Sequence, residues 1–538
     1  DMATPAGDDL GGFFGGEVAI AVTDAAVLSE MGAGVARPVV PMAAPASAAG
    51  AATPESMDAA PAPAGLVVII RASDPDAAAD QARELSAAEA GATMTETTYR
   101  GVTIHVAEPQ NEFEDGTAFA RLDDLLIVSA TGADLEPLID VHAGGEPALA
   151  DAVPFNRVRQ ELPGAFLVYG FTNGPAFREA LEPALAAAEA DLGRAFPMDQ
   201  ASIGLDAYFG FVLTAEDPGF RFDTISAPAE GAALPPTPAN FESTLDDRMP
   251  SDTLLFFNGY DFGSSVGPGL DSYGAIIGMI AAEDPTFPFP LPEDVTEAGQ
   301  AGAIYDLAGR FLAFNPRTDL VGQLVDEWAF ALSVASPDPE GIDAIFVSGA
   351  GDEVRLNDAV TKLAVWVNLL VIGGLASSAD GEQALFGDQP VGAHTEEVSG
   401  ALTQVIEIPV PDMGTSVRLQ WGIVDGQLVF GVGDGFGDYV AGPAASLAGS
   451  QRYQAVMGEL PAEHNGVFYL DLGQLLQLVQ PVIEQELATQ GAFPANTPGT
   501  PEPEFEIPDL SAIQAFAAVS YQRDGLQGSS AILYIQDQ

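Results

Sequence analysis

Apolar and polar residues alternate in short runs along most of this chain. An alternation of period two is typical of strands that bury one face, and it predicts strands at 18–22, 67–71, 102–106, 125–129, 166–169, 253–257, 329–334 and 344–347. Longer segments with apolar residues three and four positions apart predict helices at 74–88, 174–188, 301–312 and 472–487. Because acidic turns join successive strands and helices do not alternate strictly with them, we expect an α+β fold of antiparallel sheets with packed helices.

The same order of patterns occurs twice. The segment 9–22 (DLGGFFGGEVAIAV) aligns without gaps with 319–332 (DLVGQLVDEWAFAL). Three further pairs of blocks, each about 300 residues apart, follow in the same order at 122–128 and 424–430, 148–170 and 446–471, and 205–214 and 513–522. Four matched blocks in one order predict two related repeats of the same α+β unit.

These blocks divide the chain into a first repeat at 1–229, a linker at 230–240 and a second repeat at 241–538. The first repeat contains an insertion at 38–65 that is rich in Ala and Pro and cannot bury enough surface to fold alone. The second repeat opens with 249–257 and a Gly-rich loop, and nothing before Asp9 corresponds to this opening. We therefore expect the natural protein to carry a further segment before Asp1.

Several motifs of the second repeat resemble the DUF3352 family of bacterial proteins of unknown function. They are the opening at 250–257 (PSDTLLFF), the pattern Gly-x-x-x-x-Glu-x-Ala at 322–329, the hairpin at 424–429, and the turn at 446–448 that leads through Tyr453 to Glu459-Leu460-Pro461. The first repeat matches from Asp9 onward. The resemblance implies an exported or surface-anchored protein, commonly with an N-terminal hydrophobic anchor. It implies no known activity and no catalytic residues.

The charge balance excludes two classes of partner. The chain has 78 Asp and Glu residues against 18 Lys and Arg, a formal net charge of −60. Nucleic acids and anionic membrane surfaces require a basic patch, which so few cations, with Lys362 as the one lysine, do not supply. The depletion of cations predicts that partners or further copies of the chain bind through apolar or uncharged surfaces.

Cysteine usage and hydropathy limit the remaining classes. The absence of cysteine excludes disulfides, thiolate catalysis and Cys-ligated metals. The most apolar stretch, at 363–376, is too short to span a bilayer and contains Asn368 and a Gly pair, so we expect a buried helix there. The sequence does not open with the basic and apolar segments of a signal peptide.

One short motif is typical of nucleophilic chemistry. Residues 263–267 (GSSVG) satisfy Gly-x-Ser-x-Gly, which in hydrolases places a serine, here Ser265, on a tight turn between a strand and a helix. The predicted strand ends near Phe257, and neither His394 nor His464 lies in a recognisable triad context. We therefore expect a flexible Gly/Ser loop, and a serine hydrolase that uses Ser265 is the last of our alternatives.

Glycine-rich and acidic segments predict no defined cofactor or metal site. Residues 431–437 (GVGDGFG) do not fit the Gly-x-Gly-x-x-Gly register, and Asp434 and Asp438 would repel a phosphate, so we expect a strand-to-helix connection. No two of the four histidines lie two to four residues apart, as zinc ligands often do. We expect weak, diffuse association of divalent cations with acidic clusters at 112–115, 123–124, 242–247 and 434–438.

Together these features predict a protein without catalytic residues and without a cofactor. The leading hypothesis is a non-enzymatic structural protein, exported to the cell surface or the extracellular space, that assembles with itself or with protein partners. The alternative is a carrier that encloses an apolar ligand between the repeats, for which the discriminating feature is a continuous apolar cavity.

Overall fold

The chain folds, in a computed structural model, into two compact units. Unit 1 comprises residues 1–159, 172–196 and 205–208, and unit 2 comprises 160–171, 197–204 and 209–538. The structure describes residues 14–22, 66–90, 93–108, 116–192, 205–232, 237–267, 269–271, 305, 308–310, 312–336, 341–377, 393–410, 415–480 and 511–536.

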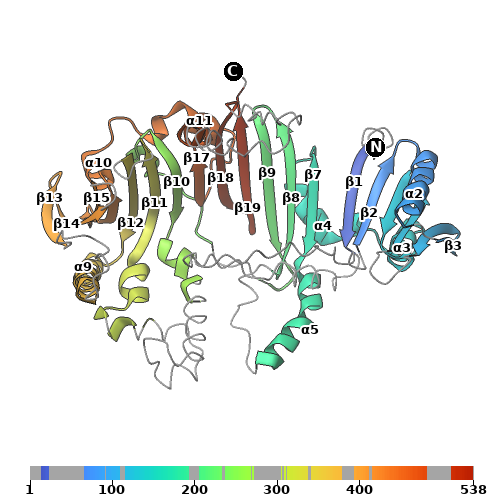
Figure 1. Ribbon diagram of the computed structural model, residues 1–538, viewed down its shortest axis with the longest axis horizontal. Coiled ribbons are helices and arrows are strands. Elements are labelled where there is room, and N and C mark those ends of the chain that lie inside the picture. The colour runs from blue at the N-terminus through green and yellow to red at the C-terminus, as the bar shows by residue number, and fades with distance from the viewer. Residues whose placement is uncertain are drawn as a thin grey trace, which may run out of the picture. The chain divides into compact units, whose positions relative to one another are not determined.

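Unit 1 contains a six-stranded antiparallel sheet in the order β1-β2-β6-β5-β4-β3 (Figure 1). Its strands are β1 (Phe14–Val22), β2 (Leu66–Ala72), β3 (Thr93–Tyr99), β4 (Val102–Glu108), β5 (Thr117–Leu122) and β6 (Leu125–Ser129). A two-residue turn joins β5 to β6, and Asp123 in this turn has a positive φ of 52°. Such turns match the right-handed twist of the strands they connect. The acidic hairpin predicted at 122–128 is confirmed.

Two helices cover opposite faces of this sheet. They are α2 (Pro75–Ala90) and α3 (Gly132–His142). Ala118 and Ala120 of β5 pack with Leu135 of α3, whereas Phe119 points to the other face and packs with Ala78 of α2. Because side chains alternate along a strand, β5 contributes to both cores.

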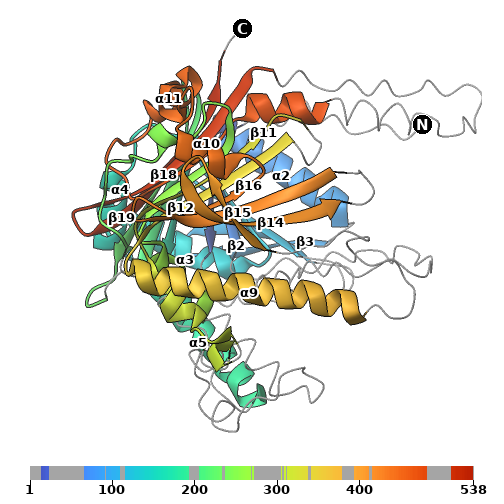
Figure 2. The same cartoon turned by 90° about the vertical axis from the view of Figure 1, so that its left-hand side faces the viewer.

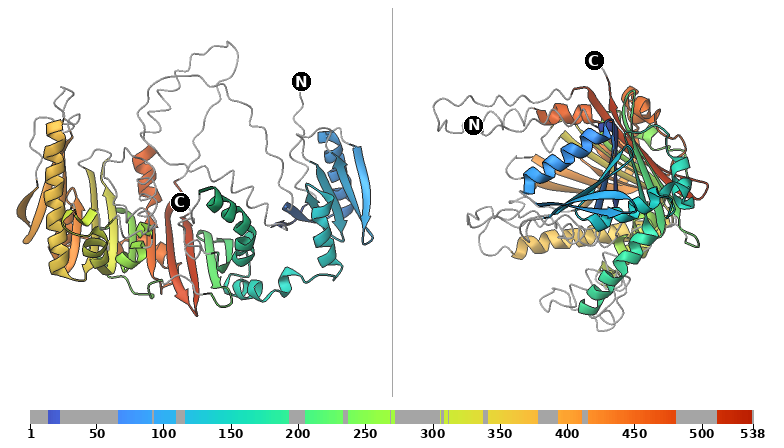
Figure 3. Two further views of the ribbon diagram at one scale, coloured as in Figure 1. Left: turned by 90° about the horizontal axis from the view of Figure 1, so that it is seen from below. Right: turned by 90° about the vertical axis from the view of Figure 1, so that its right-hand side faces the viewer.

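Unit 2 is built on a thirteen-stranded sheet in the order β13-β14-β15-β16-β12-β11-β10-β17-β18-β19-β9-β8-β7. Its strands are β7 (Val168–Asn173), β8 (Ala207–Glu216), β9 (Gly219–Pro228), β10 (Thr253–Tyr260), β11 (Leu324–Val334), β12 (Ile342–Ala350), β13 (His394–Val398), β14 (Ala401–Val410), β15 (Thr415–Val424), β16 (Gln427–Val432), β17 (Gly466–Leu470), β18 (Ile513–Arg523) and β19 (Leu526–Ile535). β10 pairs with both β11 and β17, and β19 pairs with β9 (Figures 1 and 3). Segments far apart in the sequence thus lie side by side.

Helices cover both faces of the sheet in unit 2. α10 (Gly435–Ala441) and α11 (Gln451–Met457) pack on one face, where Phe256 of β10 lies edge-on to Tyr453 with ring centroids 6.2 Å apart. Burial raises the pKa of the Tyr453 phenol. α9 (Glu353–Ser377; Figure 2) packs on the opposite face, because Leu428 of β16 contacts Leu356 whereas its neighbour Val429 belongs to the first core. The predicted α+β fold with antiparallel sheets and packed helices is confirmed.

The two halves of the chain share one order of elements. From β1 to β9 and from β11 to β19, the described residues of each half form two strands, a helix, four strands, two helices, a strand, a helix and two strands, apart from short 3₁₀ turns. The later helices are α4 (Val153–Glu161) and α5 (Gly174–Leu192) in the first half, and α10, α11 and 472–480 in the second, with α3 as the counterpart of α10. The sheet order β3-β4-β5-β6-β2-β1 likewise corresponds to β13-β14-β15-β16-β12-β11.

β10 has no counterpart among the described strands of the first half. The compact units and the predicted repeats divide at different residues, because β7, β8 and β9 are strands of the sheet in unit 2. That the two halves are copies of one unit, with boundaries at 229 and 241, remains our prediction.

Most predicted elements have the expected position. The strand predicted at 166–169 is shifted, because β7 begins at Val168 and the preceding Phe166 and Leu167 are exposed. The other predicted strands fall within observed ones, and the helices predicted at 74–88 and 174–188 are α2 and α5. The insertion at 38–65 and most of the helix predicted at 301–312 lie outside the described residues.

Candidate functional site

Each sheet has one edge strand with mostly polar or charged side chains. Among the described strands, β3 (TMTETTY) ends the sheet of unit 1 and combines Glu96 with four threonines, while β13 ends the sheet of unit 2 and carries Glu396 and Glu397. An edge strand exposes unpaired N–H and C=O groups to any other strand, and charged side chains on it oppose such pairing. We call β3 and β13 the guarded edges, because their side chains oppose the pairing of a further strand.

The opposite edges, β1 and β7, are apolar. In β1 only Glu17 is charged, and Val18, Ile20 and Val22 are 57%, 69% and 43% exposed. β7 (VYGFTN) has no charged residue, and its Val168 is 47% exposed. Among the described strands, β1 and β7 each have one neighbour in their sheet. Such an edge is suited to accept a further strand.

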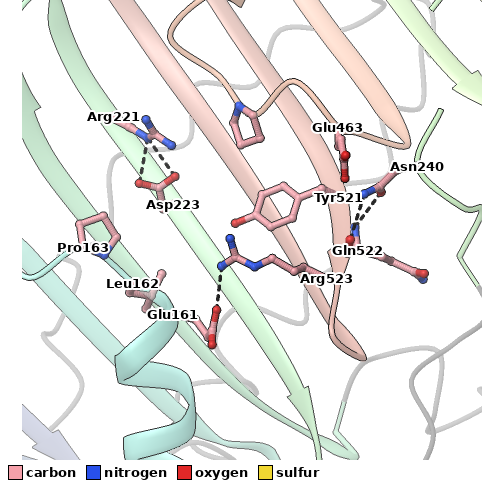
Figure 4. Close-up of a pocket in the computed structure, with 11 residues that line it drawn as sticks. Glu161, Leu162, Pro163, Arg221, Asp223, Asn240, Glu463, Tyr521, Gln522 and Arg523 are labelled. Atoms are coloured by element: carbon pink, nitrogen blue, oxygen red, sulfur yellow. Dashed lines mark hydrogen bonds and ion pairs between the residues drawn. The ribbon is translucent and has the colours of Figure 1, made fainter. Parts of the chain in front are cut away.

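A pocket of about 420 Å³ in unit 2 has charged walls (Figure 4). Arg221 on β9 donates from Nε to both carboxylate oxygens of the buried Asp223, each at 3.0 Å, and from Nη1 to the Glu459 carbonyl oxygen at 3.1 Å. Arg523 on β18 donates to the Glu161 carboxylate at 2.7 Å. Burial, followed by the charge of Asp223, raises the pKa of the Tyr521 phenol.

Both guanidinium groups of this pocket are neutralised by carboxylates. The ion pairs connect β9, β18 and the end of α4, and the walls include Glu161-Leu162-Pro163 and Pro461 from the two Glu-Leu-Pro motifs. Removing one member of such a pair leaves an uncompensated charge in a partly buried place. The chemistry of the pocket is therefore that of a structural network.

A second pocket in unit 2, of about 390 Å³, has an uncharged lining. Hydroxyl and amide side chains from four strands form its walls: Thr224, Ser226, Asn258, Ser520, Gln527 and Ser529. Trp328 lies over Gly259, its direct partner on the neighbouring strand, and a Cβ at Gly259 would lie only 2.8 Å from the indole Nε1. Gly259 therefore leaves the space that the indole ring occupies.

A row of aromatic rings crosses the face of the sheet that carries α9. Direct cross-strand pairs connect Trp421 to Phe430, Phe430 to Phe346, Phe346 to Phe330, Phe330 to Phe257, and Phe257 to Phe468. Ring centroids are 4.9 Å apart for Phe257 and Phe468, and 6.2 Å apart for Trp421 and Phe430. Phe430 is 36% exposed. Aromatic pairs of this kind stabilise a sheet and also present apolar surface.

Comparison with known proteins identifies the family. The family model described as "Protein of unknown function (DUF3352)" matches residues 8–497. The chain belongs to the DUF3352 family. A search of curated proteins and a search of solved structures each return no significant match. The resemblance stated from the sequence motifs is confirmed, and the family description carries no activity.

In this DUF3352 protein, Ser265 lies in a helix rather than in the expected Gly/Ser loop. Residues 262–267 are helical because the Asp261 carboxylate accepts from the Ser264 N–H at 3.2 Å and the Asp261 carbonyl accepts from the Ser265 N–H at 3.0 Å. The Ser265 hydroxyl donates to the Tyr260 carbonyl at 3.3 Å. The structure thus gives this hydroxyl a main-chain acceptor rather than an imidazole.

The four histidines of the DUF3352 protein lie in four different parts of the fold. His105, His142 and His394 lie 3.3–3.5 Å from carboxylates of Glu96, Asp123 and Glu396. His464 precedes β17 and is buried, and burial lowers its pKa, while the charge of Glu327 acts in the opposite direction. Within the described residues, no three His, Asp or Glu side chains form a group that could hold a metal ion.

The Gly-rich segment 431–437 connects β16 to α10, so the predicted strand-to-helix connection is confirmed. Asp438 lies near Asp434, Asp343 and Asp252; burial first, and then these charges, raise its pKa. Elsewhere, Asp124 pairs with Arg71, and the cluster at 112–115 lies outside the described residues. Diffuse cation association stays a prediction.

The apolar stretch 363–376 belongs to α9 of the DUF3352 protein. Ala364 is buried, whereas Val365 is 54% exposed, so the described part is a helix with one buried face. None of the helices in the described residues combines the length and apolar character that crossing a membrane requires.

Sequence reasoning missed the apolar sheet edges and the aromatic row. Part of the signal for the row was present, because Phe257, Phe330 and Phe346 each lie in a predicted strand. What was missing was the pairing of those strands, which places the rings next to one another.

Proposed function

We propose that this DUF3352 protein is a non-enzymatic structural protein, exported to the cell surface or beyond, and that it works as a subunit of a larger assembly. The observation that supports this function best is the apolar edge of β1, where Val18, Ile20 and Val22 are exposed next to main-chain groups with which no described strand pairs. Adding a strand to such an edge satisfies those groups and buries the side chains.

The charge of the chain favours the same kind of contact. With a net charge of −60, two copies or two similarly acidic partners repel one another over most of their surfaces. Association then depends on places where charge is scarce. In β1 the five residues after Glu17, Val18 to Val22, are all uncharged.

The test is the oligomeric state of two edge variants. Ile20→Lys places a cation on the apolar edge, and the matched control Thr97→Lys places the same cation on β3, the guarded edge of the same sheet. We expect the native chain and Thr97→Lys to form larger species in light scattering and native mass spectrometry, and Ile20→Lys to remain small. A native chain that is monomeric at all concentrations, or an Ile20→Lys variant that assembles normally, contradicts the proposal.

A second candidate function is the binding of an apolar ligand, which the aromatic row from Trp421 to Phe468 favours. The partly exposed Phe430 offers a flat apolar contact on the face that carries α9. Native mass spectrometry of the purified chain would detect a lipid or pigment that co-purifies. Its loss in Phe430→Glu, with Glu397→Gln as a surface control, supports a carrier; a chain that carries no ligand counts against it.

A further inference from the structure

Strands β1 and β11 share one local design. In the gap-free alignment of 9–22 with 319–332, Glu17 corresponds to Glu327. Both strands contain an irregularity that adds two residues relative to the neighbouring strand: from Phe14 to Val18 against β2, and from Val325 to Trp328 against β12. The aligned glutamates lie inside this bulge in both strands. Bulges are specific features of a strand, so their coincidence supports the alignment.

The two strands differ in their number of neighbours. β11 lies between β12 and β10, whereas β1 pairs with β2 and, among the described strands, with no other. The difference appears in the burial of aligned residues: Ala329 of β11 is fully buried, and its counterpart Ala19 of β1 is exposed. The alternating apolar pattern of β1 is thus typical of a strand inside a sheet. Among the described strands, however, β1 has a neighbour on one side only.

The glutamate of β11 holds the segment that leads into β10. Residues 241–250, which we call the strap, precede β10 directly. The Glu327 carboxylate accepts from the Thr244 N–H at 2.9 Å, the Thr244 hydroxyl at 2.5 Å, the Leu245 N–H at 3.1 Å and the Ser243 hydroxyl at 3.1 Å. It also accepts from the Asn258 side chain of β10 at 2.9 Å. One carboxylate therefore fixes both the strap and the strand.

The corresponding Glu17 has a different environment. It is 67% exposed and accepts from Arg71 Nε at 2.8 Å. The position that corresponds to Arg71 in β12 is Gly349, so the second half has no arginine at this place. Glu17 thus lies at the position where Glu327 binds the strap, and its exposed carboxylate can accept further hydrogen bonds.

We propose that the free edge of β1 binds an antiparallel strand of the β10 type, supplied by a partner polypeptide. The pairing of β10 with β11 fixes the register: the residue equivalent to Asn258 lies opposite Ala19, and the residue equivalent to Phe257 lies opposite Ile20. The preceding turn carries Ser or Thr, which donate to Glu17. This inference rests on the proposed function and names the kind of strand that completes the edge.

The experiment uses the 538-residue chain and a synthetic peptide with the sequence of residues 241–260, which contains the strap and β10. Hydrogen–deuterium exchange with mass spectrometry follows the amides of 14–22 with and without the peptide. We expect the peptide to slow exchange in 14–22 at least tenfold. The control peptide carries Leu255→Pro and Phe256→Pro, which remove main-chain donors and prevent a strand, and is expected to give no protection.

Variants of the chain distinguish a specific contact between the peptide and Glu17 from nonspecific binding of the peptide. Glu17→Gln removes one acceptor oxygen and the charge, and we expect the peptide to bind at least fivefold more weakly. Glu96→Gln makes the same change on the guarded edge β3, and we expect unchanged binding. Equal binding to both variants overturns the role of Glu17.

Two outcomes distinguish this inference from the proposed function. If Ile20→Lys abolishes assembly but the peptide does not protect 14–22, the edge serves association and the β10-type strand is refuted. If protection of 14–22 in the chain alone rises with protein concentration and the peptide does not displace the second copy, the strand that fits this edge is not of the β10 type, and the inference also fails.

Discussion

Glu327 is the residue whose removal tests the architecture of unit 2 most directly. Its carboxylate accepts hydrogen bonds from Ser243, Thr244 and Leu245 of the strap and from Asn258 of β10. Leu245 and Asn258 are 1% and 2% exposed, so water cannot replace the carboxylate at these two donors. Ser243 and Thr244 lie nearer the surface, where water can take over.

The expected loss follows from these donors. A buried donor left without a partner costs about 1–3 kcal/mol, and Glu327→Ala orphans the Leu245 N–H and one Asn258 amide hydrogen. We therefore expect Glu327→Ala to lower the free energy of unfolding of unit 2 by about 2–6 kcal/mol. Glu327→Gln keeps one acceptor oxygen and a similar shape, and we expect a loss of about 1.5–3 kcal/mol.

Urea denaturation followed by tryptophan fluorescence measures this loss. All three tryptophans, Trp328, Trp366 and Trp421, belong to unit 2, so the signal reports the unfolding of that unit. The control Glu397→Gln removes the same charge from an exposed position of β13 and is expected to stay within about 0.5 kcal/mol of the native chain. If Glu327→Ala also stays within that limit, the strap is not held by Glu327 and the reasoning is refuted.

Four further predictions concern stability. Burial lowers the pKa of His464 in the folded chain, so the unfolded chain binds a proton at this residue more readily. The free energy of unfolding should therefore fall as the pH drops below about 6.5. We expect His464→Gln to reduce this fall, measured as the urea midpoint between pH 5 and 8. Burial and nearby carboxylates raise the pKa of Asp438, so Asp438→Asn should stabilise unit 2 by about 0.2–0.5 kcal/mol at pH 7, and the gain should vanish near pH 3.5, below the unfolded pKa of about 3.8. Leu135→Ala in the core of unit 1 should cost about 2–5 kcal/mol in circular-dichroism melts, whereas Leu149→Ala, at 55% exposure, should cost little. Gly525→Ala should cost about 1–2 kcal/mol in urea, because its φ of 75° is strained for any residue with a Cβ although no atom lies nearby.

The local parts of the fold could be predicted from the sequence because they depend on neighbouring residues. The alternation at 125–129 and the turn Asp425-Gly426, with φ angles of 51° and 76°, specify strands and hairpins without reference to the rest of the chain. The short helix at 262–267 was missed because its Gly/Ser composition is typical of loops, while the capping contact from Asp261 becomes visible only with the backbone in place.

The long-range parts could not be predicted in the same way. A period of two shows which residues share a face, but not which strand lies beside it. Nothing in the sequence of β10 indicates that it lies between β11 and β17. The edges and the aromatic row depend on that order, so the candidate surfaces emerged only from the structure.

The position of β10 also has a consequence for biosynthesis. Its Leu255 pairs with Leu470, which is added to the nascent chain 215 residues later. A ribosome that adds about 5–20 residues per second leaves this side of β10 uncovered for about 10–40 s. β19 closes onto β9, so the sheet is completed only after Ile535 has left the exit tunnel. Until β17 has left the tunnel, Phe257 of β10 lacks its cross-strand partner Phe468.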